Sequence, residues 1–332
     1  MNDSHPNPHP EERSMTAPVR LDGMPTEERN PRSLHLDELE VDELVEVISG
    51  EDRYALEAVE RARPQIAALV RLGVESLAGG GTIHYVGSGT SGRLGVLDAV
   101  ELVPTYNVGP ELVTAHLAGG PGAFLKAVEG AEDDEQAGRE LAAGFRAGDL
   151  VVGLAASGRT PYVRGALLGA AEVGARTGVV AANPRAPLAE LADVAVLLET
   201  GPEVVTGSTR MKAATAQKMV INTFSTAVMV RCGRTYSNLM IEVLTTNEKL
   251  RARAVRMLEQ ASGRPEADCR AALTEALTIH REGGPSAIKI ALVALLAGSA
   301  VPAAAEAAAR FPADPSRAGD PSGVRAAVAS LG

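Results

Sequence analysis

The chain has 332 residues, of which 45% are hydrophobic but only 3% are aromatic, and its length suggests two domains. Its core must therefore be built from Ala, Val, Leu and Ile, a composition typical of layered α/β proteins. The net charge of −10 argues against general binding to nucleic acid or to anionic membranes, because both need a basic surface.

The beginning of the chain and its two cysteines indicate the compartment. Residues 1–25 are rich in Pro, His and charged residues, and we expect a disordered tail. The first 30 residues lack the apolar stretch of a signal peptide. Cys232 and Cys269 lie in no paired metal or redox spacing, so a reduced cytoplasmic chain is favoured over a structural disulfide.

The pattern along the chain is helical at first and then alternates between strands and helices. We expect helices at 42–48 and 55–77, the second ended by three glycines. Short apolar strands then alternate with helices, which predicts a parallel, doubly wound sheet. The predicted strands are 82–86, 112–116, 149–155, 178–182 and 194–198. The predicted helices between them are 93–102, which stops before Pro104, and 122–128, 134–146 and 161–172.

The second half of the chain reads as helical. The segment 213–232 is a long, nearly uncharged helix, which implies burial or a subunit interface. From residue 247 onward we expect only helices, with turns at 263–265 and 283–285 and a loop at 312–323. The apolar run 287–305 comes closest to a membrane span, but Lys289 and Pro302 interrupt it, so a buried helix is expected.

A Gly/Ser/Thr loop follows the first strand and opens the next helix. Glycines let the backbone approach an anion, and the first turn of a helix offers unpaired N–H groups. A literal GxGxxG match also exists, but a dinucleotide site wants an acidic residue at the end of the next strand, which ends at His116 without one. Phosphate-monoester binding is therefore favoured over a dinucleotide or a plain tight turn. The predicted phosphate ligands are Gly87, Ser88, Gly89, Thr90 and Ser91.

Two further loops carry hydroxyls and cations. Ser157, Gly158, Arg159 and Thr160 follow a strand and precede Pro161, which is well placed at the start of a helix. Ordinary helix capping explains Thr160 but not the whole run, and the carboxyl ends of two parallel strands meet at one crevice. The loop 201–218 could close this crevice with a hydroxyl and two cations, or it is a structural loop with a helix cap. The residues concerned are Ser208, Arg210 and Lys212.

Two glutamates are candidates for proton transfer. Glu101 lies on the mostly apolar stretch 94–103, interrupted otherwise only by Asp98, so it must find a partner or a solvated cleft. Glu132 belongs to the acidic run 129–135, for which a solvated helix start is the competing interpretation.

Taken together, the motifs resemble one family. The stretches VGSGTSGRLGVLDAVE, VEGAEDD, VVGLAASGRTPYV, EVVTGSTRMKAATAQKMV and NLMIEVLTTNEKLRAR resemble the N-acetylmuramic acid 6-phosphate etherases of the sugar isomerase (SIS) superfamily. The resemblance runs from about Thr26 to the helical C-terminus. It implies an α/β fold with a doubly wound parallel sheet of SIS type flanked by helices. Residues 26–245 would form the SIS sugar-phosphate domain with its N-terminal helices, and 246–332 a C-terminal helical subdomain.

The resemblance also implies an activity. The expected enzyme is a homodimeric cytoplasmic lyase that recycles cell-wall sugar, needs no metal or organic cofactor and binds no nucleic acid or membrane. It would convert N-acetylmuramic acid 6-phosphate to N-acetylglucosamine 6-phosphate and D-lactate. The family's two catalytic glutamates match Glu101 and Glu132. The chain departs from the family pattern at 100–105, which reads VELVPT, and at Ala214.

The reaction fits two carboxylates. In the open-chain sugar the C2 proton is α to an aldehyde, so lactate on C3 leaves by elimination and water then adds back, which requires a base and an acid. We assign these transfers to Glu101, with Glu132 assisting ring opening or the second transfer. Glu101 lies about 13 Å along a helix from Gly92, farther than a sugar reaches between its phosphate and C3. Either the helix ends early or Glu101 acts in the partner subunit's site.

Two other functions share the fold. A sugar-phosphate-sensing regulator would bind the same ligand without catalysis, although such proteins usually carry a second SIS domain or a DNA-binding module. An aldose–ketose isomerase would also abstract a C2 proton. The EGAE run and the TGSTRMKA segment favour the etherase.

Overall fold

Five apolar segments form the parallel sheet of an α/β body, and the computed structural model describes residues 24–243 and 247–332. The strands lie in the order β2-β1-β3-β4-β5, and every pair is parallel. This order reverses its direction between β1 and β3, which places a crevice at the carboxyl ends of those two strands. The five strands are β1 (Ile83–Gly87), β2 (Val113–Leu117), β3 (Leu150–Ala155), β4 (Arg176–Ala181) and β5 (Val194–Leu197).

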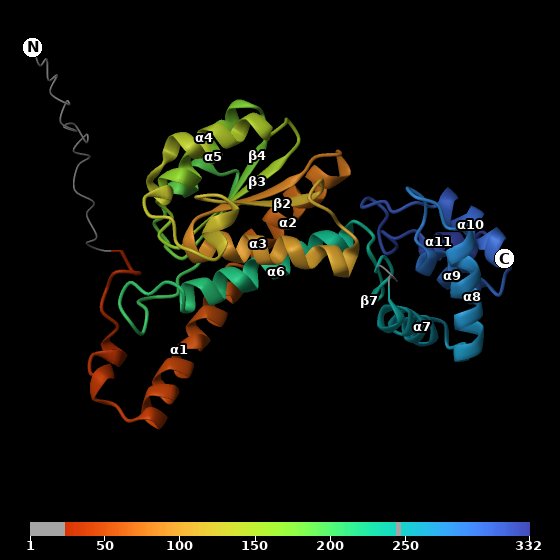
Figure 1. Ribbon diagram of the computed structural model, residues 1–332, viewed down its shortest axis with the longest axis horizontal. Helices are drawn as coiled ribbons and strands as arrows, with labels where there is room; N and C mark the ends of the chain where they lie inside the picture. Colours follow the sequence, from red (N-terminus) through yellow and green to blue (C-terminus); the bar gives the residue numbers. More distant parts are fainter. Residues whose placement is uncertain (1–23, 244–246) are drawn as a thin grey trace, which may run out of the picture.

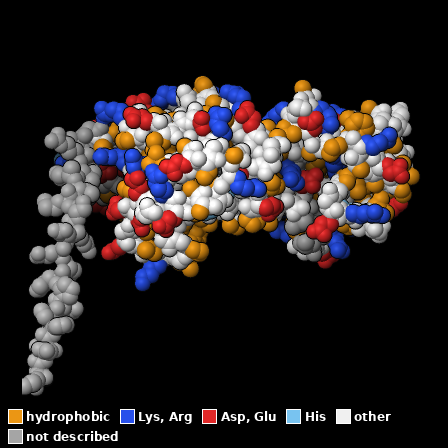
Figure 2. Space-filling model, turned by 90° about the horizontal axis from the view of Figure 1, so that it is seen from above, with side chains coloured by type: hydrophobic (Ala, Val, Ile, Leu, Met, Phe, Trp, Pro, Cys, Tyr) orange, Lys and Arg blue, Asp and Glu red, His pale blue; other side chains and the backbone are white. Residues whose placement is uncertain are grey.

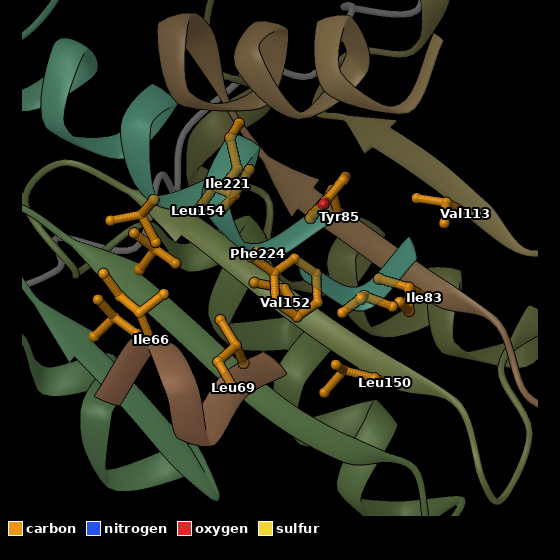
Figure 3. Close-up of a cluster of buried hydrophobic side chains, with 14 of the residues drawn as sticks. Ile66, Leu69, Ile83, Tyr85, Val113, Leu150, Val152, Leu154, Ile221 and Phe224 are labelled. Carbon is orange, nitrogen blue, oxygen red and sulfur yellow. The ribbon is translucent and has the colours of Figure 1, made fainter. Parts of the chain in front are cut away.

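Helices cover both faces of the sheet, which is why β1 and β3 are buried along their whole length and contain few polar residues. α2 (Arg63–Ala78), α3 (Gly89–Tyr106) and α6 (Lys212–Arg231) pack on one face. Figure 3 shows the centre of that layer, where side chains of α2 and α6 meet those of β1 and β3. The other face is covered by α4 (Glu135–Leu141) and α5 (Pro161–Glu172).

The N-terminal helices differ from the prediction. A single helix, α1 (Val41–Arg61), runs through the predicted break, and it projects away from the body (Figure 1). Its interior Gly50 faces open space, and its buried Glu51 is paired with Lys212, so nothing ends the helix there. The break comes at Ala62 instead, because Pro64 lies in the first turn of α2, where its missing N–H costs no hydrogen bond.

Three helix predictions in the body also differ from the structure. The helix predicted at 93–102 begins four residues earlier and includes Pro104 in its last turn, ending at Asn107 in the left-handed conformation. The helix predicted at 122–128 is only a short 3-10 turn (Pro121–Phe124). Arg93 explains this, since its guanidinium donates to the carbonyls of Ala123 and Phe124 at 2.7 and 2.9 Å. The helix predicted at 134–146 ends at Leu141, whereas the helix 161–172 and the five strands were predicted within two residues.

The C-terminal part is helical, as predicted. Figure 1 shows it as a separate group of helices beside the body. Its own apolar cluster is built from residues between Tyr236 and Leu331, and it buries nearly all of α9. The turns at 263–265 and 283–285 and the loop at 312–323 are confirmed. The helices are α7 (Glu248–Ser262), α8 (Glu266–Ile279), α9 (Ala287–Ala297), α10 (Val301–Arg310) and α11 (Val324–Ala329).

A small antiparallel hairpin that the sequence did not predict links the two parts. It consists of β6 (Thr235–Tyr236) and β7 (Leu239–Met240). Within the described ranges no single helix has the length and apolar character to cross a membrane. Only α9 and α10 taken together do, and they meet at a bend of 111°. Cys232 and Cys269 are both free thiols.

The predicted boundaries of the tail and of the two domains fall mostly outside the described residues. Of the expected tail 1–25, only Met24 and Pro25 are described. Met24 is buried, and its Sδ lies 3.2 Å from Arg159. Met24 therefore packs on the folded chain, and the rest of the predicted tail, 1–23, lies outside the described residues. The boundary at 245/246 also lies outside the described residues, so the division into two domains stays a prediction.

Candidate functional site

The glycine loop is the first turn of α3. Ser88 is the N-cap residue, and no side chain caps the first turn that Gly89 begins. The first N–H groups of a helix have no partner within it, so this turn presents unpaired donors at the carboxyl end of β1. Gly87 and Gly92 allow it to form. A Cβ on Gly92 would lie 2.6 Å from the carbonyl oxygen of Gly87, so any larger residue would push α3 away from β1.

The hydroxyls of this turn point in different directions. Ser91 is buried, and its Oγ donates to Oε1 of Gln217 on α6 at 2.7 Å. Ser91 therefore holds α3 against α6, and it does not face the crevice as predicted. Thr90 is partly exposed, and Ser88 faces the acidic segment that follows β2.

Glu132 is brought to the glycine loop. Its Oε2 accepts a hydrogen bond of 3.4 Å from Ser88 Oγ, although the two residues lie 44 apart in sequence. A cavity of about 310 Å³ separates the two segments, and Ser88, Gly89, Arg93 and Glu132 all line it. An anion held by the first turn of α3 would therefore have a carboxylate beside it, an arrangement suited to proton transfer on a bound phosphate ester.

Glu101 lies away from this cavity. α3 is one continuous helix, so twelve residues separate Glu101 from Gly89, or about 18 Å at 1.5 Å per residue. Its side chain is exposed, beside the exposed Leu97 and Val100. The helix does not end early, which removes the first of the two explanations offered by the sequence.

Asp98, one turn before Glu101, is a structural residue. It is 4% exposed and accepts hydrogen bonds from Tyr85, Asn222 and Ser225 at 2.7–3.0 Å. Burial raises the pKa of this carboxyl, while the three hydrogen bonds oppose the rise. The two acidic residues of α3 thus have opposite environments, one inside the core and one at the surface.

The second loop stands beside the first, since β3 pairs with β1. The Ser157 carbonyl accepts a hydrogen bond of 2.9 Å from Asn183, and Gly158 adopts a φ of +68° against Ala186. The loop is therefore fixed. Thr160 is the N-cap residue of α5, but its side chain makes no capping bond. Arg159 is exposed.

The third loop places its predicted residues differently. Ser208 is partly exposed and Arg210 is exposed, whereas Lys212 is only 1% exposed. Lys212 Nζ lies 2.5 Å from Oε2 of Glu51 on α1, and Glu203 accepts hydrogen bonds from two amides at the start of α6. The structure thus gives Lys212 a buried ion pair in place of the open cation that the sequence predicted.

Residues that the sequence did not single out hold this third loop. Asn30 donates to Oε2 of Glu51 at 2.7 Å and to the Pro202 carbonyl at 3.2 Å, and Arg32 also pairs with Glu51. Hydrogen bonds from Arg32, Lys212 and Asn30 outweigh burial and hold the pKa of Glu51 at about 2. The only signal in the sequence was the resemblance, which begins at Thr26.

A larger cavity lies elsewhere. It has a volume of about 690 Å³ between α1, α2 and α6 and is lined mainly by apolar side chains. None of the predicted site residues lines it, and convergent polar groups are what distinguish a ligand site from an apolar groove. The cavity between Ser88 and Glu132 is therefore the better candidate.

Comparisons with known proteins find matches to parts of this chain. Residues 65–170 match the family model of the glucokinase regulatory protein N-terminal SIS domain. A phosphoheptose isomerase from Francisella tularensis is similar in structure over 57% of this chain and 98% of its own, with a TM-score of 0.46 and 16% identity.

Similarity to curated proteins extends further along the chain. The N-acetylmuramic acid 6-phosphate etherase of Thermobifida fusca is 51% identical over 85% of this chain and 90% of its own length. Those of Symbiobacterium thermophilum and Pectobacterium atrosepticum are 50% and 48% identical, over 84% and 87% of this chain and 91% and 93% of their own lengths.

Proposed function

The chain belongs to the N-acetylmuramic acid 6-phosphate etherase family, and we propose that it cleaves the D-lactyl ether of that sugar phosphate. The products are N-acetylglucosamine 6-phosphate and D-lactate. The observation that supports this most directly is the approach of Glu132 to the uncapped first turn of α3. The setting that follows is the cytoplasm, in the recycling of cell-wall sugar, because a phosphorylated sugar does not cross membranes unaided.

The reaction needs no activated leaving group. In the ring-opened sugar a base removes the C2 proton, the electron pair forms the C2–C3 double bond, and the C3–O bond breaks as lactate takes up a proton. Water then adds, with its oxygen bonding to C3 and a proton returning to C2. Each positioned acid or base contributes roughly 10²–10⁴ in rate. Ser88, Gly89 and Thr90 would hold the phosphate, with Ser157, Thr160, Ser208 and Arg210 around the sugar.

We assign the C2 and lactate proton transfers to Glu101 and ring opening or the second transfer to Glu132. Since about 18 Å separates Glu101 from the phosphate turn of its own chain, the site must take Glu101 from a second subunit. Exposed apolar residues support such a dimer. They form a surface, the α3 strip, consisting of Leu97, Val100, Val103, Phe124, Leu125 and Val128.

The geometry of a two-fold pair fits this assignment. Arg93 binds the loop that carries Phe124, so the α3 strip runs from the Glu132 cavity along α3 to Glu101. Two antiparallel copies of α3 related by an axis near Leu97 would place Glu101 opposite the partner's Arg93, which lines that cavity. Each dimer would then hold two complete sites.

The test of function is release of D-lactate from N-acetylmuramic acid 6-phosphate. We expect the wild type to release it, and Glu101→Gln and Glu132→Gln each to lower kcat by about 10²–10⁴. Glu135→Gln is the control, because Glu135 belongs to the same acidic run but pairs with Arg164 outside the cavity. Full activity of Glu101→Gln, or an isomerised sugar without lactate, would contradict the proposal.

Mixed dimers test the sharing of sites. If Glu101 and Glu132 of one site come from different chains, a dimer of one E101Q and one E132Q chain has one intact site. An equal mixture that exchanges freely should then recover about a quarter of wild-type activity, although each variant alone is nearly inactive. A mixture that stays as inactive as its components means that both glutamates serve the same chain's site.

A further inference from the structure

A second polar cavity lies between the α/β body and the helical C-terminal part, far along the chain from the glycine loop. Its volume is about 410 Å³, within the range of about 300–1,000 Å³ usual for small-molecule sites. Figure 2 shows the two parts of the molecule meeting at a narrower waist. Residues 232–234, just after α6, form one wall of the cavity, and α9 and the end of α10 form the other.

Lys289 is the unusual residue of this cavity. It is the one charged residue in the apolar helix α9, and it is only 4% exposed. Its Nζ donates to the Phe311 carbonyl at 3.0 Å, while an ammonium group has three protons to donate. Among the described residues no carboxylate lies within 4.0 Å of Nζ, so this buried charge lacks the close counterion that usually accompanies one.

Two other charges line the same cavity. Arg234 projects from the body and Glu242 from the segment after β7, and neither forms an ion pair within 4.0 Å among the described residues. Burial raises the pKa of the Glu242 carboxyl and lowers the pKa of the Lys289 ammonium. Among the residues that line the cavity, two cations face one carboxylate, and the buried Asp320 behind them also acts on Lys289.

A neighbouring cavity extends the same feature. Its volume is about 520 Å³, and it shares Cys232, Arg234 and two other wall residues with the first. Arg317 and Asp314 both line it and pair with each other at 3.9 Å, so Arg234 is its unpaired cation among the lining residues. Arg234 therefore stands between two spaces, where its guanidinium can bind a carboxylate or a phosphate with two hydrogen bonds.

We propose that the cavity lined by Arg234, Glu242 and Lys289 binds a small hydroxylated anion, a carboxylate or a phosphate monoester, separately from the site at Ser88 and Glu132. The two cations hold the anionic group, and Glu242 accepts a hydrogen bond from a hydroxyl of the ligand. Because the walls come from both parts of the molecule, the bound anion fixes one part against the other and raises the melting temperature.

Binding can be measured by isothermal titration calorimetry on the full chain, with three probes: D-lactate, N-acetylglucosamine 6-phosphate and inorganic phosphate. We expect at least one of them to bind the wild type and to bind Lys289→Met and Arg234→Gln at least tenfold more weakly. Both variants should keep their lactate-releasing activity. Which probe binds distinguishes a carboxylate, a sugar phosphate and free phosphate as the source of the anion.

Three further variants make the result decisive. Arg310→Gln is the matched control, because Arg310 is exposed on α10 and does not line the cavity, so its binding should equal that of the wild type. Glu132→Gln should bind the same probe as tightly as the wild type. If Lys289→Met does not fold, the affinity of Arg234→Gln alone tests the proposal. The proposal is overturned if no probe binds, if Arg234→Gln binds like the wild type, or if Gly89→Val at the α3 turn abolishes the same binding event.

Discussion

Glu51 shows how one buried carboxylate ties three segments together. It accepts hydrogen bonds from Asn30, Arg32 and Lys212 while only 3% exposed. Glu51→Gln should lower the free energy of unfolding at pH 7 by about 3–5 kcal/mol, because two cations lose their partner. Urea denaturation measures this. Glu57→Gln is the control, since Glu57 forms an exposed pair with Arg61 and should cost less than about 1 kcal/mol.

The pH dependence of that difference follows from the lowered pKa of Glu51. Its contribution is complete above the ordinary value of 4.5 and is lost as the pH falls toward 2. The difference in free energy of unfolding between the wild type and Glu51→Gln should therefore become smaller below pH 4.5. A difference that stays constant down to pH 3 would show that Glu51 stabilises the protein by packing alone.

A pair of histidines between two strands should respond to acid. His84 Nδ1 lies 3.0 Å from His116 Nε2, an arrangement that needs one donor and one acceptor. Burial lowers the pKa of both rings, that of His116 to about 4, so both favour the neutral form in the folded protein. Their contribution to stability is complete above pH 6.5 and is lost as the pH falls toward 4.

The corresponding variant is His116→Gln. Between pH 6.5 and 5 the wild type should lose up to about 1.4 kcal/mol per pH unit more than this variant does, as measured by chemical denaturation. His35→Gln, at an exposed histidine, should keep the wild-type slope. Equal slopes for the wild type and His116→Gln would show that His116 takes up its proton at the same pH in the folded and unfolded states.

At the scale of an element, α3 combines an anion site, a core helix and an exposed strip. Gly92→Ala should destabilise the protein by about 1–3 kcal/mol and raise KM, because the new Cβ meets backbone of β1. Gly50→Ala in α1 is the opposite case: its Cβ faces open space in a helix interior, so it should stabilise by about 0.5–1 kcal/mol. Thermal melts and steady-state kinetics of both variants check this, and equal effects of the two would contradict it.

The sequence predicted the strands better than the helix that carries the site. Buried parallel strands are continuous apolar runs, so β1 and β3 were found within one residue. The glycine loop was taken as a loop because Gly and Ser favour turns, yet its residues are already helical at Gly89. Pro104 was expected to end α3, but the helix continues through it to Tyr106 and is capped by Asn107 in the αL conformation.

The site was predictable only in part, because its geometry depends on contacts between distant residues. Ser88 and Glu132 were each named as candidate site residues, but no pattern in the sequence predicted the hydrogen bond that joins them across 44 residues. The inward turn of Ser91 depends on the rotation of α3 about its axis, which Gln217 fixes from 126 residues away. The pairing of Lys212 with Glu51 spans 161 residues, and no local sequence pattern predicts it.

At the scale of the whole molecule, the α3 strip predicts a dimer. Val100→Glu places a charge at its centre and should give a folded monomer with activity lowered at least 100-fold, measured by light scattering and lactate release. Val45→Glu on α1 is the control, because Val45 is equally exposed, at 61% against 60%, but lies off the strip. If Val45→Glu separates the subunits and Val100→Glu does not, the interface lies on the α1 side.

The ion pair between Glu51 and Lys212 also has a consequence for synthesis on the ribosome. The two residues are 161 apart, which at about 5–20 residues per second is a delay of roughly 8–30 s. All five strands of the sheet, which end at Leu197, leave the ribosome before Lys212 does. The sheet can thus form before Lys212 is available to pair with Glu51 of α1 and before α6 can pack on the sheet. The loop with Ser208 and Arg210, which Asn30 binds at Pro202, can therefore take its final position only after the sheet has left the ribosome.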